Sequence, residues 1–376
     1  MEIDDFFPKS ISSIKNGRDF IGWLCTYTPE EIIVAGGFTP YRMMGSLITN
    51  KSESFFPINF CPYLKSAWES LYTDRKNKLK AIVFTTSCDG MRRLIDTFRK
   101  YRPDIPAFVL DVPRKKDSAS LDYFRETLCE FTRFIEELRG QNITQEELIR
   151  AIEIVNKKRI LLKRLKEIYE SYFPLIDAST YFKIMKISMT SELEIFVEEL
   201  EKYIDFVCSN SFGNSCTTNN KSTINSWYNL GIIGNFINED RLWEIFSDLN
   251  LKISFQDLCL STRYFENLVE VASGKSPLQS ISERYLKKPS CFREASLGQK
   301  LIETEKSIRA NGIDGIIFIT LKFCDNTMYF FPLLKKALLE RLKIPSLYLE
   351  IEYQNFSAGQ VKTRIQAFLE MLEQTR

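Results

Sequence analysis

Ala81-Ile-Val-Phe-Thr-Thr-Ser-Cys88-Asp-Gly-Met-Arg-Arg93 is the stretch that decides the fold. Its apolar run Ile82-Val83-Phe84 is flanked by polar residues, which is typical of a buried strand. Apolar residues then recur at helical spacing, beginning with Met91. Cys88 therefore lies where a strand ends and a helix begins. Because a helix N-terminus carries partial positive charge and free N–H groups, this position favours a thiolate and suits a metal ligand or a nucleophile.

The same order of features returns near the C-terminus, in Gly315-Ile-Ile-Phe-Ile-Thr-Leu-Lys-Phe-Cys324-Asp325. In each half a strand, a Cys-Asp pair and a helix lead to an Ile-Pro dipeptide and another strand. We interpret this as an internal repeat, which predicts two α/β domains that each present a cysteine at the carboxyl edge of a sheet. Ligands of open α/β sheets bind at that edge. Two ordinary βαβ units with buried cysteines would give the same pattern.

A long helical pattern separates the two repeats. Thr144 and Glu147 have the spacing of a capping box at the start of one of these helices. The basic run from Lys157 to Lys166 is predicted to be a solvated helix face. The predicted domains are an α/β domain over residues 1–117, a helical bridge and polar linker over 118–226, and a second α/β domain over 227–376.

Composition places the chain among ordinary globular proteins. It has 376 residues and a formal net charge of +2, so the charge gives no sign of nucleic-acid binding. No apolar run approaches the roughly 20 residues that would span a bilayer. The acidic N-terminus lacks the pattern of a secretory signal. These features predict a cytoplasmic protein without a membrane partner.

The numbers of cysteines and histidines limit the kinds of catalytic and metal site that the chain can form. The chain has no histidine, which excludes Ser-His and Cys-His catalysis and histidine-ligated metals within it. Nine cysteines in a chain of this kind favour metal binding or catalysis over disulfides. There is no Cys-x-x-Cys pair, so a cluster must gather distant cysteines. Neither a Walker A motif nor G-x-G-x-x-G is present, so ATP chemistry would come from a partner.

Cys61 shares the position of Cys88 and Cys324, because it precedes Pro62, a residue that can open a helix. Three thiolates could hold a [4Fe–4S] cluster and leave one iron open as a Lewis acid. This geometry requires the two sheet edges to face each other across a cleft.

Four segments of the sequence carry a family resemblance. They are Tyr27-Thr-Pro-Glu-Glu-Ile-Ile-Val-Ala-Gly-Gly, Ser87-Cys-Asp-Gly, Lys322-Phe-Cys-Asp, and Leu349-Glu-Ile-Glu followed by Gly359-Gln-Val-Lys-Thr-Arg-Ile-Gln-Ala-Phe-Leu-Glu-Met-Leu. Together they resemble the 2-hydroxyacyl-CoA dehydratase and benzoyl-CoA reductase family, whose members include the D-component of 2-hydroxyglutaryl-CoA dehydratase. The length resembles that of the smaller subunit of such enzymes.

The resemblance implies two Rossmann-like domains with a [4Fe–4S] cluster between them, held by Cys61, Cys88 and Cys324. It also implies a related larger subunit and a separate ATP-hydrolysing iron–sulfur activator. A low-potential electron would convert a CoA thioester to a radical, which is then dehydrated to an enoyl-CoA or reduced. Glu31 is the candidate acid/base or iron-facing residue, and a carboxylate that only stabilises a helix start is the alternative.

The remaining cysteines receive weaker expectations. Cys259 and Cys291 could lie near the cluster or be buried structural residues, and Cys208 and Cys216 are expected to be incidental.

A second interpretation within the family is a homodimeric double-cubane reductase, in which the same three cysteines hold a larger [8Fe–9S] assembly. A third is a cluster-free ligand-binding protein with two α/β lobes.

Overall fold

Two four-stranded parallel sheets form the framework of the computed structural model, which describes residues 3–11, 19–73, 79–173, 175–212 and 228–374. The strand orders are β2-β1-β3-β4 and β6-β5-β7-β8, so the two halves repeat one topology. This confirms the expected α/β fold with two Rossmann-like lobes. The strands are β1 (Phe20–Trp23), β2 (Thr39–Arg42), β3 (Leu79–Thr85), β4 (Ala107–Leu110), β5 (Asn229–Gly234), β6 (Lys252–Asp257), β7 (Gly315–Leu321) and β8 (Ser346–Ile351).

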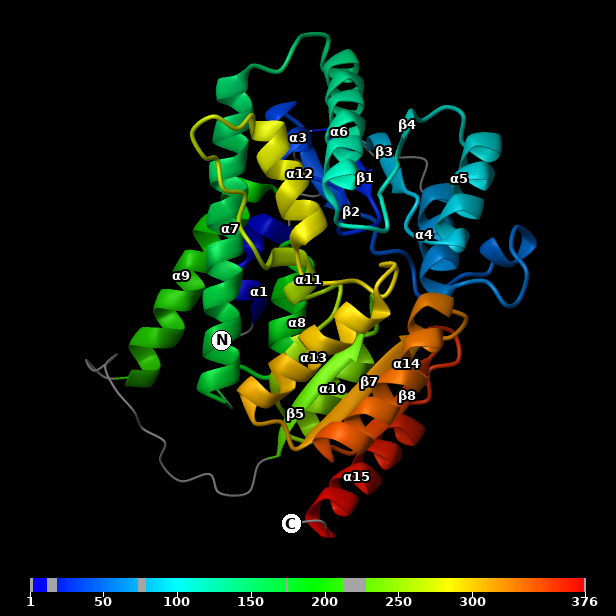
Figure 1. The fold of residues 1–376 in the computed structure, drawn as a ribbon, viewed down its shortest axis with the longest axis vertical. Coiled ribbons are helices and arrows are strands. Elements are labelled where there is room, and N and C mark those ends of the chain that lie inside the picture. The colour runs from blue at the N-terminus through cyan, green and yellow to red at the C-terminus, as the bar shows by residue number, and fades with distance from the viewer. Residues whose placement is uncertain (1–2, 12–18, 74–78, 174, 213–227, 375–376) are drawn as a thin grey trace.

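Helices cover both lobes and fill the space beside them (Figure 1). Those of the first half are α1 (Ile3–Phe6), α3 (Glu30–Ala35), the 3-10 turn η1 (Ser52–Ser54), α4 (Pro62–Thr73), α5 (Asp89–Tyr101), α6 (Ser118–Arg139), α7 (Gln145–Ser171), α8 (Ala178–Ile187) and α9 (Leu193–Phe212). Those of the second half are α10 (Asp240–Asp248), α11 (Thr262–Phe265), α12 (Pro277–Lys287), α13 (Leu297–Asn311), α14 (Asp325–Ala337), the π-turn η2 (Leu338–Leu342) and α15 (Ala358–Gln374).

The central strand of each sheet is buried on both faces. Ile82, Val83 and Phe84 of β3 are fully buried, and every residue of β7 is buried. A parallel strand covered by helices on both sides has no solvent face, so its sequence is a continuous apolar run rather than an alternating one. The apolar stretches around 82–84 and 315–321 therefore form one inner strand of each sheet, buried as the sequence predicted.

The helices between the two sheets contact both halves of the chain. Helix α7 packs against α3 of the first half, and α6 packs against α12 of the second half. Thr144 and Glu147 form the predicted capping box at the start of α7. The division into domains at residues 117 and 226 stays a prediction. Cys216, which was expected to be incidental, lies in a segment outside the described residues.

The prediction of a solvated basic face on α7 is wrong for two of its residues. Lys158 and Arg159 are only 2% and 3% exposed. Lys158 forms an ion pair of 2.8 Å with Glu30, and Arg159 forms one of 2.6 Å with Glu31. Helix α7 is covered by α3 along this face, so the basic residues lie in a contact between two helices rather than in water.

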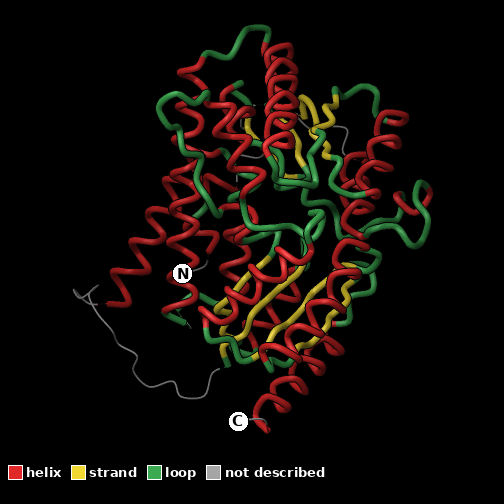
Figure 2. Tube along the Cα trace, in the orientation of Figure 1, coloured by secondary structure: helices red, strands yellow, loops and turns green. Residues whose placement is uncertain are grey.

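The two lobes meet through the loops that follow their strands. Figure 2 shows these loops gathered between the two sets of strands. The Arg42 Nη1 atom donates to the Cys259 carbonyl at 3.0 Å, and the Asn238 amide donates to the Met44 carbonyl at 3.0 Å. The carboxyl ends of both sheets therefore face one another. None of the described helices combines the length and the apolar character that crossing a membrane requires.

Candidate functional site

The three cysteines singled out by their sequence positions lie at the starts of three helices. Cys88 is the N-cap of α5, where its Sγ atom accepts a hydrogen bond of 3.4 Å from the Met91 amide. Cys324 is the N-cap of α14, and Cys61 directly precedes α4. Phe323 has a φ of 61°, a left-handed conformation that is uncommon outside glycine, and it turns the chain into α14 at Cys324.

All three thiols lie between two cavities. Each of them lines an inner cavity of about 120 Å³ and an outer cavity of about 670 Å³. The inner cavity is lined by residues from both lobes, and much of its wall is apolar, with Leu24, Leu64, Phe236 and Leu321 contributing. Three cysteines that are far apart in the sequence therefore share one wall between the lobes.

Three further cysteines line the same inner cavity: Cys25, Cys259 and Cys291. The Arg263 Nη1 atom donates to the Cys259 Sγ atom at 3.5 Å and to the Cys291 Sγ atom at 4.0 Å. Sequence reasoning placed Cys259 and Cys291 near the site as one of two possibilities, and it missed Cys25. A signal was available, because Cys25 and Cys259 both follow the last residue of a strand by two positions.

Burial raises the pKa of two of the thiols on the shared wall, Cys61 and Cys88. The pKa of Cys88 rises to about 12, and the neighbouring Cys324 thiol adds to both shifts. The backbone N–H groups of the helix starts lower these pKa values, but by less. For Cys61 and Cys88, burial therefore outweighs the helix N-terminus, which was expected to favour a thiolate. A bound metal cation would be needed to hold these sulfurs as thiolates.

Cys25 behaves differently because cations surround it. Burial raises the pKa of its thiol, but the Lys288 ammonium, a backbone hydrogen bond at Tyr27 and the Arg42 guanidinium together bring the pKa below its ordinary value. Lys288 is itself buried and bonds the Thr26 side chain at 2.9 Å. The surroundings of Cys25 therefore favour negative charge on its sulfur.

This contrast predicts an order of thiol reactivity. Burial lowers the pKa of Lys288 to about 7, so the test is made at about pH 6.5, where Lys288 still carries its charge. There we expect iodoacetamide to alkylate Cys25 of the metal-free protein about tenfold or more faster than Cys88, because the larger thiolate fraction outweighs the lower nucleophilicity of a more acidic thiol. Peptide-resolved mass spectrometry measures both rates. Lys288→Met is expected to slow the reaction at Cys25 alone. Faster labelling of Cys88 would contradict the charge assignment.

The side chains around the inner cavity are thiols, the donor type that holds iron–sulfur clusters. No three His, Cys, Asp or Glu residues within the described ranges converge closely enough to hold one metal ion. A single zinc ion draws its thiolates to about 2.3 Å from one point. The thiolates of an iron–sulfur cluster bind separate irons and stand further apart. Free thiols that surround a cavity from several elements match the second arrangement.

Glu31 does not line either cavity around the thiols. Its carboxylate is fully buried in α3, where it pairs with Arg159 and accepts a hydrogen bond of 2.9 Å from the Tyr285 hydroxyl. Burial raises the pKa of Glu31, but the Arg159 and Arg284 charges outweigh it and hold the pKa below its ordinary value. Glu31 is thus a charged carboxylate between helices.

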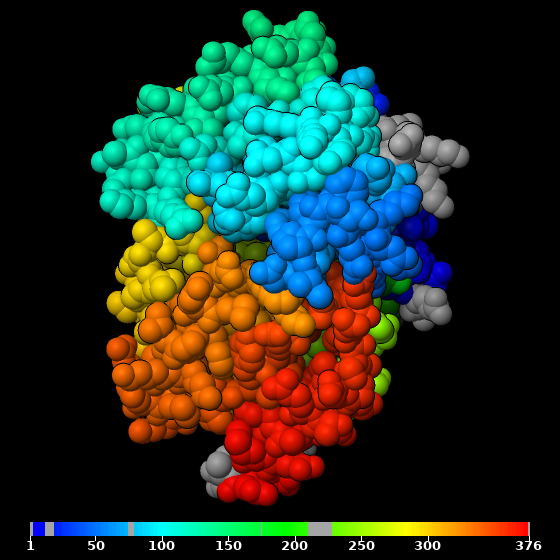
Figure 3. Space-filling model, turned by 90° about the vertical axis from the view of Figure 1, so that its right-hand side faces the viewer, coloured from blue at the N-terminus to red at the C-terminus, as the bar shows by residue number. Residues whose placement is uncertain are grey.

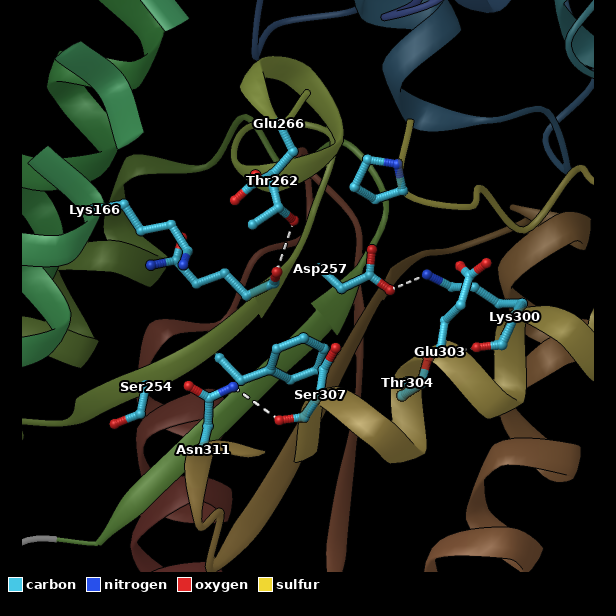
Figure 4. Close-up of a pocket in the computed structure, with 13 residues that line it drawn as sticks. Lys166, Ser254, Asp257, Thr262, Glu266, Lys300, Glu303, Thr304, Ser307 and Asn311 are labelled. Carbon is cyan, nitrogen blue, oxygen red and sulfur yellow. Dashed lines mark hydrogen bonds and ion pairs between the residues drawn. The ribbon is translucent and has the colours of Figure 1, made fainter. Parts of the chain in front are cut away.

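A polar cavity of about 240 Å³ lies behind the inner wall, between β6 and α13 (Figure 4). Asp257 sits at its side and forms ion pairs with Lys300 and, at 2.7 Å, with Arg263. Asp257 therefore holds the Arg263 guanidinium in the position from which it donates to Cys259 and Cys291 in the inner cavity. The positive charge of Arg263 is thereby matched by a buried carboxylate.

The outer cavity opens where the two lobes meet, on the side of the molecule that carries α4, α5 and α14 (Figure 3). Its wall carries charges of both signs, from Arg93 and Arg114 and from three aspartates, Asp89, Asp96 and Asp325. Phe55, Phe60 and Phe323 give it apolar surface. A molecule that enters this cavity reaches the three thiols of the shared wall.

Two parallel α/β lobes that each carry cysteines to one cavity between them define the structural class of this protein. The chain belongs to the family described as 2-hydroxyglutaryl-CoA dehydratase, D-component, which its residues 25–372 match. It is therefore an enzyme subunit of the dehydratase and benzoyl-CoA reductase type.

Its similarity to individual members extends over the whole chain. It is 26% identical to the (R)-phenyllactyl-CoA dehydratase beta subunit of Clostridium sporogenes, over 95% of this chain and 93% of that protein. It is 24% identical to the lactoyl-CoA dehydratase beta subunit of Anaerotignum propionicum, with the same coverage. It is 23% identical to a benzoyl-CoA reductase subunit of Thauera aromatica, over 93% of this chain and 89% of that protein.

Proposed function

We propose that this chain is the iron–sulfur subunit of a 2-hydroxyacyl-CoA dehydratase-like or benzoyl-CoA reductase-like enzyme, and that Cys61, Cys88 and Cys324 hold a [4Fe–4S] cluster. The observation that carries the proposal is the convergence of these three distant cysteines on one wall between the lobes. When bound, the cluster would supply a low-potential electron for radical dehydration or reduction of a CoA thioester.

The residues around the thiols have separate tasks in this proposal. The apolar inner wall, with Leu24, Phe236 and Leu321, excludes water from the sulfurs. The outer cavity gives an electron donor or a substrate access to the same sulfurs. Of the two roles considered for Glu31, its contacts favour a carboxylate that fixes α3 against α7, and an acid/base role stays a prediction.

The partners follow from the same assignment. The relatives are named as subunits of dehydratases and a reductase, which supports a related larger subunit as partner. The sequence has no nucleotide-binding motif, so ATP hydrolysis would belong to a separate iron–sulfur activator. We place the complex in the cytoplasm of a cell that lives without oxygen, because an open iron in a low-potential cluster reacts with oxygen.

A second candidate is favoured by the inner cysteines. A homodimeric reductase with a double-cubane [8Fe–9S] assembly needs more thiolates than three, and Cys25, Cys259 and Cys291 line the same cavity as the first set. Arg263 donates hydrogen bonds to two of these sulfurs and would stabilise them as thiolates once a metal is bound, although burial raises the pKa of the Cys259 thiol to about 11. In this alternative the two sets of cysteines would hold the two halves of the assembly.

Iron and sulfide analysis after anaerobic purification distinguishes the candidates. We expect about four irons per chain for a single cluster and about eight for the double cubane. Cys259→Ser is expected to leave the iron content unchanged in the first case and to lower it in the second. A wild-type chain without iron would overturn both and leave a cluster-free binding protein. Capture of a related subunit, as opposed to self-association, separates the heterodimer from the homodimer.

A further inference from the structure

Two arginines on the inner wall of the thiol cavity form no ion pair within the described part of the chain. Arg42, at the end of β2, is 1% exposed, and Arg293, in the loop before α13, is 4% exposed. Both line the inner cavity. The third arginine of this wall, Arg263, is paired with Asp257 and so serves as the internal comparison.

Arg42 bonds only to uncharged acceptors. Its Nη1 atom donates to the Cys259 carbonyl at 3.0 Å and to the Met189 sulfur at 3.3 Å, and its Nη2 atom donates to the Leu24 carbonyl at 3.4 Å. Its Nε atom is buried and has no acceptor among the described residues. The guanidinium carbon lies 3.9 Å from the centre of the Phe236 ring. The positive charge is therefore held in place but not neutralised.

Arg293 repeats this arrangement on the other side of the cavity. It donates to the Val112 carbonyl at 2.6 Å and to the Pro113 carbonyl at 2.8 Å, and its buried Nε atom meets no acceptor in the described ranges. The half-buried Asp111 carboxylate feels the Arg293 charge but forms no ion pair with it within the described part of the chain. Its two oxygens accept hydrogen bonds from the Thr86 and Tyr123 hydroxyls.

An unpaired buried guanidinium is unfavourable, and arginine cannot relieve it by losing a proton. Buried charges in proteins are therefore normally paired or coordinate a metal. The missing negative charge must come from something that occupies the cavity that both arginines line. Six thiols line that cavity, and thiols that bind a metal do so as negatively charged thiolates.

We infer that Arg42 and Arg293 form an anion-binding site on the inner wall of the cavity, and that its occupant is the thiolate-bound iron–sulfur assembly. This inference rests on the proposed function and assigns the charge balance of its cofactor. Each thiolate ligand brings one negative charge into an apolar enclosure, and the two guanidinium groups offset it.

The arrangement has a consequence for electron transfer. The assembly gains one negative charge when it is reduced, so a nearby cation stabilises the reduced form more than the oxidised form. Net charge and hydrogen bonding around the sulfurs set the reduction potential of iron–sulfur centres. Arg42 and Arg293 thus raise the reduction potential of the assembly and act as positioning residues, without contact with substrate.

The test is a potentiometric titration of the anaerobically purified protein, followed by electron paramagnetic resonance, for wild type, Arg42→Gln, Arg42→Lys and Arg293→Gln. We expect the glutamine variants to keep their iron and to show a more negative midpoint potential, and Arg42→Lys to stay close to wild type. Arg284→Gln is the matched control, because Arg284 is also buried and bonds to backbone carbonyls but does not line the cavity.

Each outcome of this titration bears on a different claim. A folded Arg42→Gln protein that loses iron, while Arg42→Lys retains it, also supports the anion site, because only the glutamine variant removes the positive charge. Iron-loaded glutamine variants with an unchanged midpoint potential would overturn the inference while leaving the proposed function intact. Iron loss in both Arg42 variants would overturn charge balance as the role of Arg42. A wild-type protein without iron contradicts the proposed function itself.

Discussion

Cys88→Ser is expected to lower the iron content of the anaerobically purified protein from about four irons per chain to below about one, and to remove the activity of the assembled enzyme. Serine replaces a soft thiolate with a hydroxyl that iron binds poorly. The fold should survive, because Cys88 is the N-cap of α5 and serine is among the best N-cap residues. Iron analysis, circular dichroism and thermal unfolding of the metal-free chain measure the two effects separately.

Cys208→Ser is the matched control for this variant. Cys208 lies on α9, is half-buried and lines neither of the two cavities around the thiols. Its replacement should leave the iron content at the wild-type level. Full iron content in Cys88→Ser would remove Cys88 from the ligand set. Loss of iron in Cys208→Ser as well would mean that the measurement reports general instability.

Arg159→Ala is expected to lower the free energy of unfolding by about 3–5 kcal/mol, the usual cost of breaking a buried ion pair by removing one partner. It leaves Glu31 buried without its cation, and the Tyr285 hydroxyl remains as its hydrogen-bond donor. Denaturant unfolding of the metal-free chain at neutral pH measures the loss.

The pH dependence of this variant identifies the charge as the cause. In the wild type the folded pKa of Glu31 lies below the unfolded value of about 4.5, so its stabilisation is complete above that value and is lost as the pH falls through the folded pKa. Without Arg159, burial is opposed chiefly by the Arg284 charge, so the pKa of Glu31 should rise. The difference in free energy of unfolding between the wild type and Arg159→Ala should therefore shrink as the pH is lowered. A difference independent of pH would indicate lost packing instead.

A double variant tests the acid/base prediction for Glu31. Arg159→Met with Glu31→Gln removes both charges and keeps an acceptor for Tyr285, so most of the stability should return. If Glu31 only fixes α3 against α7, activity returns with stability. An inactive but stable double variant would establish a direct chemical role for Glu31.

Much of the fold was readable because it depends on local pattern. The apolar runs at 82–84 and 315–321 could only be strands buried on both faces, and the turn after each placed Cys88 and Cys324 at helix starts. Pro62 gave Cys61 the same position. These features follow from neighbours in the sequence, so no knowledge of distant contacts was needed.

The inner half of the site was not readable in the same way. Cys291 precedes no regular element that marks it, and its place beside Arg263 depends on how the loop after α12 folds back. Arg42 resembles an ordinary charged residue at a strand end. Its burial results from contact with the second lobe, where it reaches the Cys259 carbonyl.

The basic run of α7 shows the same limit. Helical spacing indicates which residues share a face, but it does not indicate what packs on that face. Lys158 and Arg159 are buried because α3 brings Glu30 and Glu31 against them. A charged face that meets complementary charges has the same sequence pattern as one that meets water.

The sequence by itself determined two repeated α/β lobes, three cysteines at helix starts and the exclusion of histidine chemistry, because each depends on residue type and short-range spacing. Only the tertiary structure decided that six thiols share one cavity, that two arginines without an ion pair among the described residues line it and that Glu31 lies apart from it. These features arise where segments more than a hundred residues apart come into contact, and their charges become significant only once water is excluded between them.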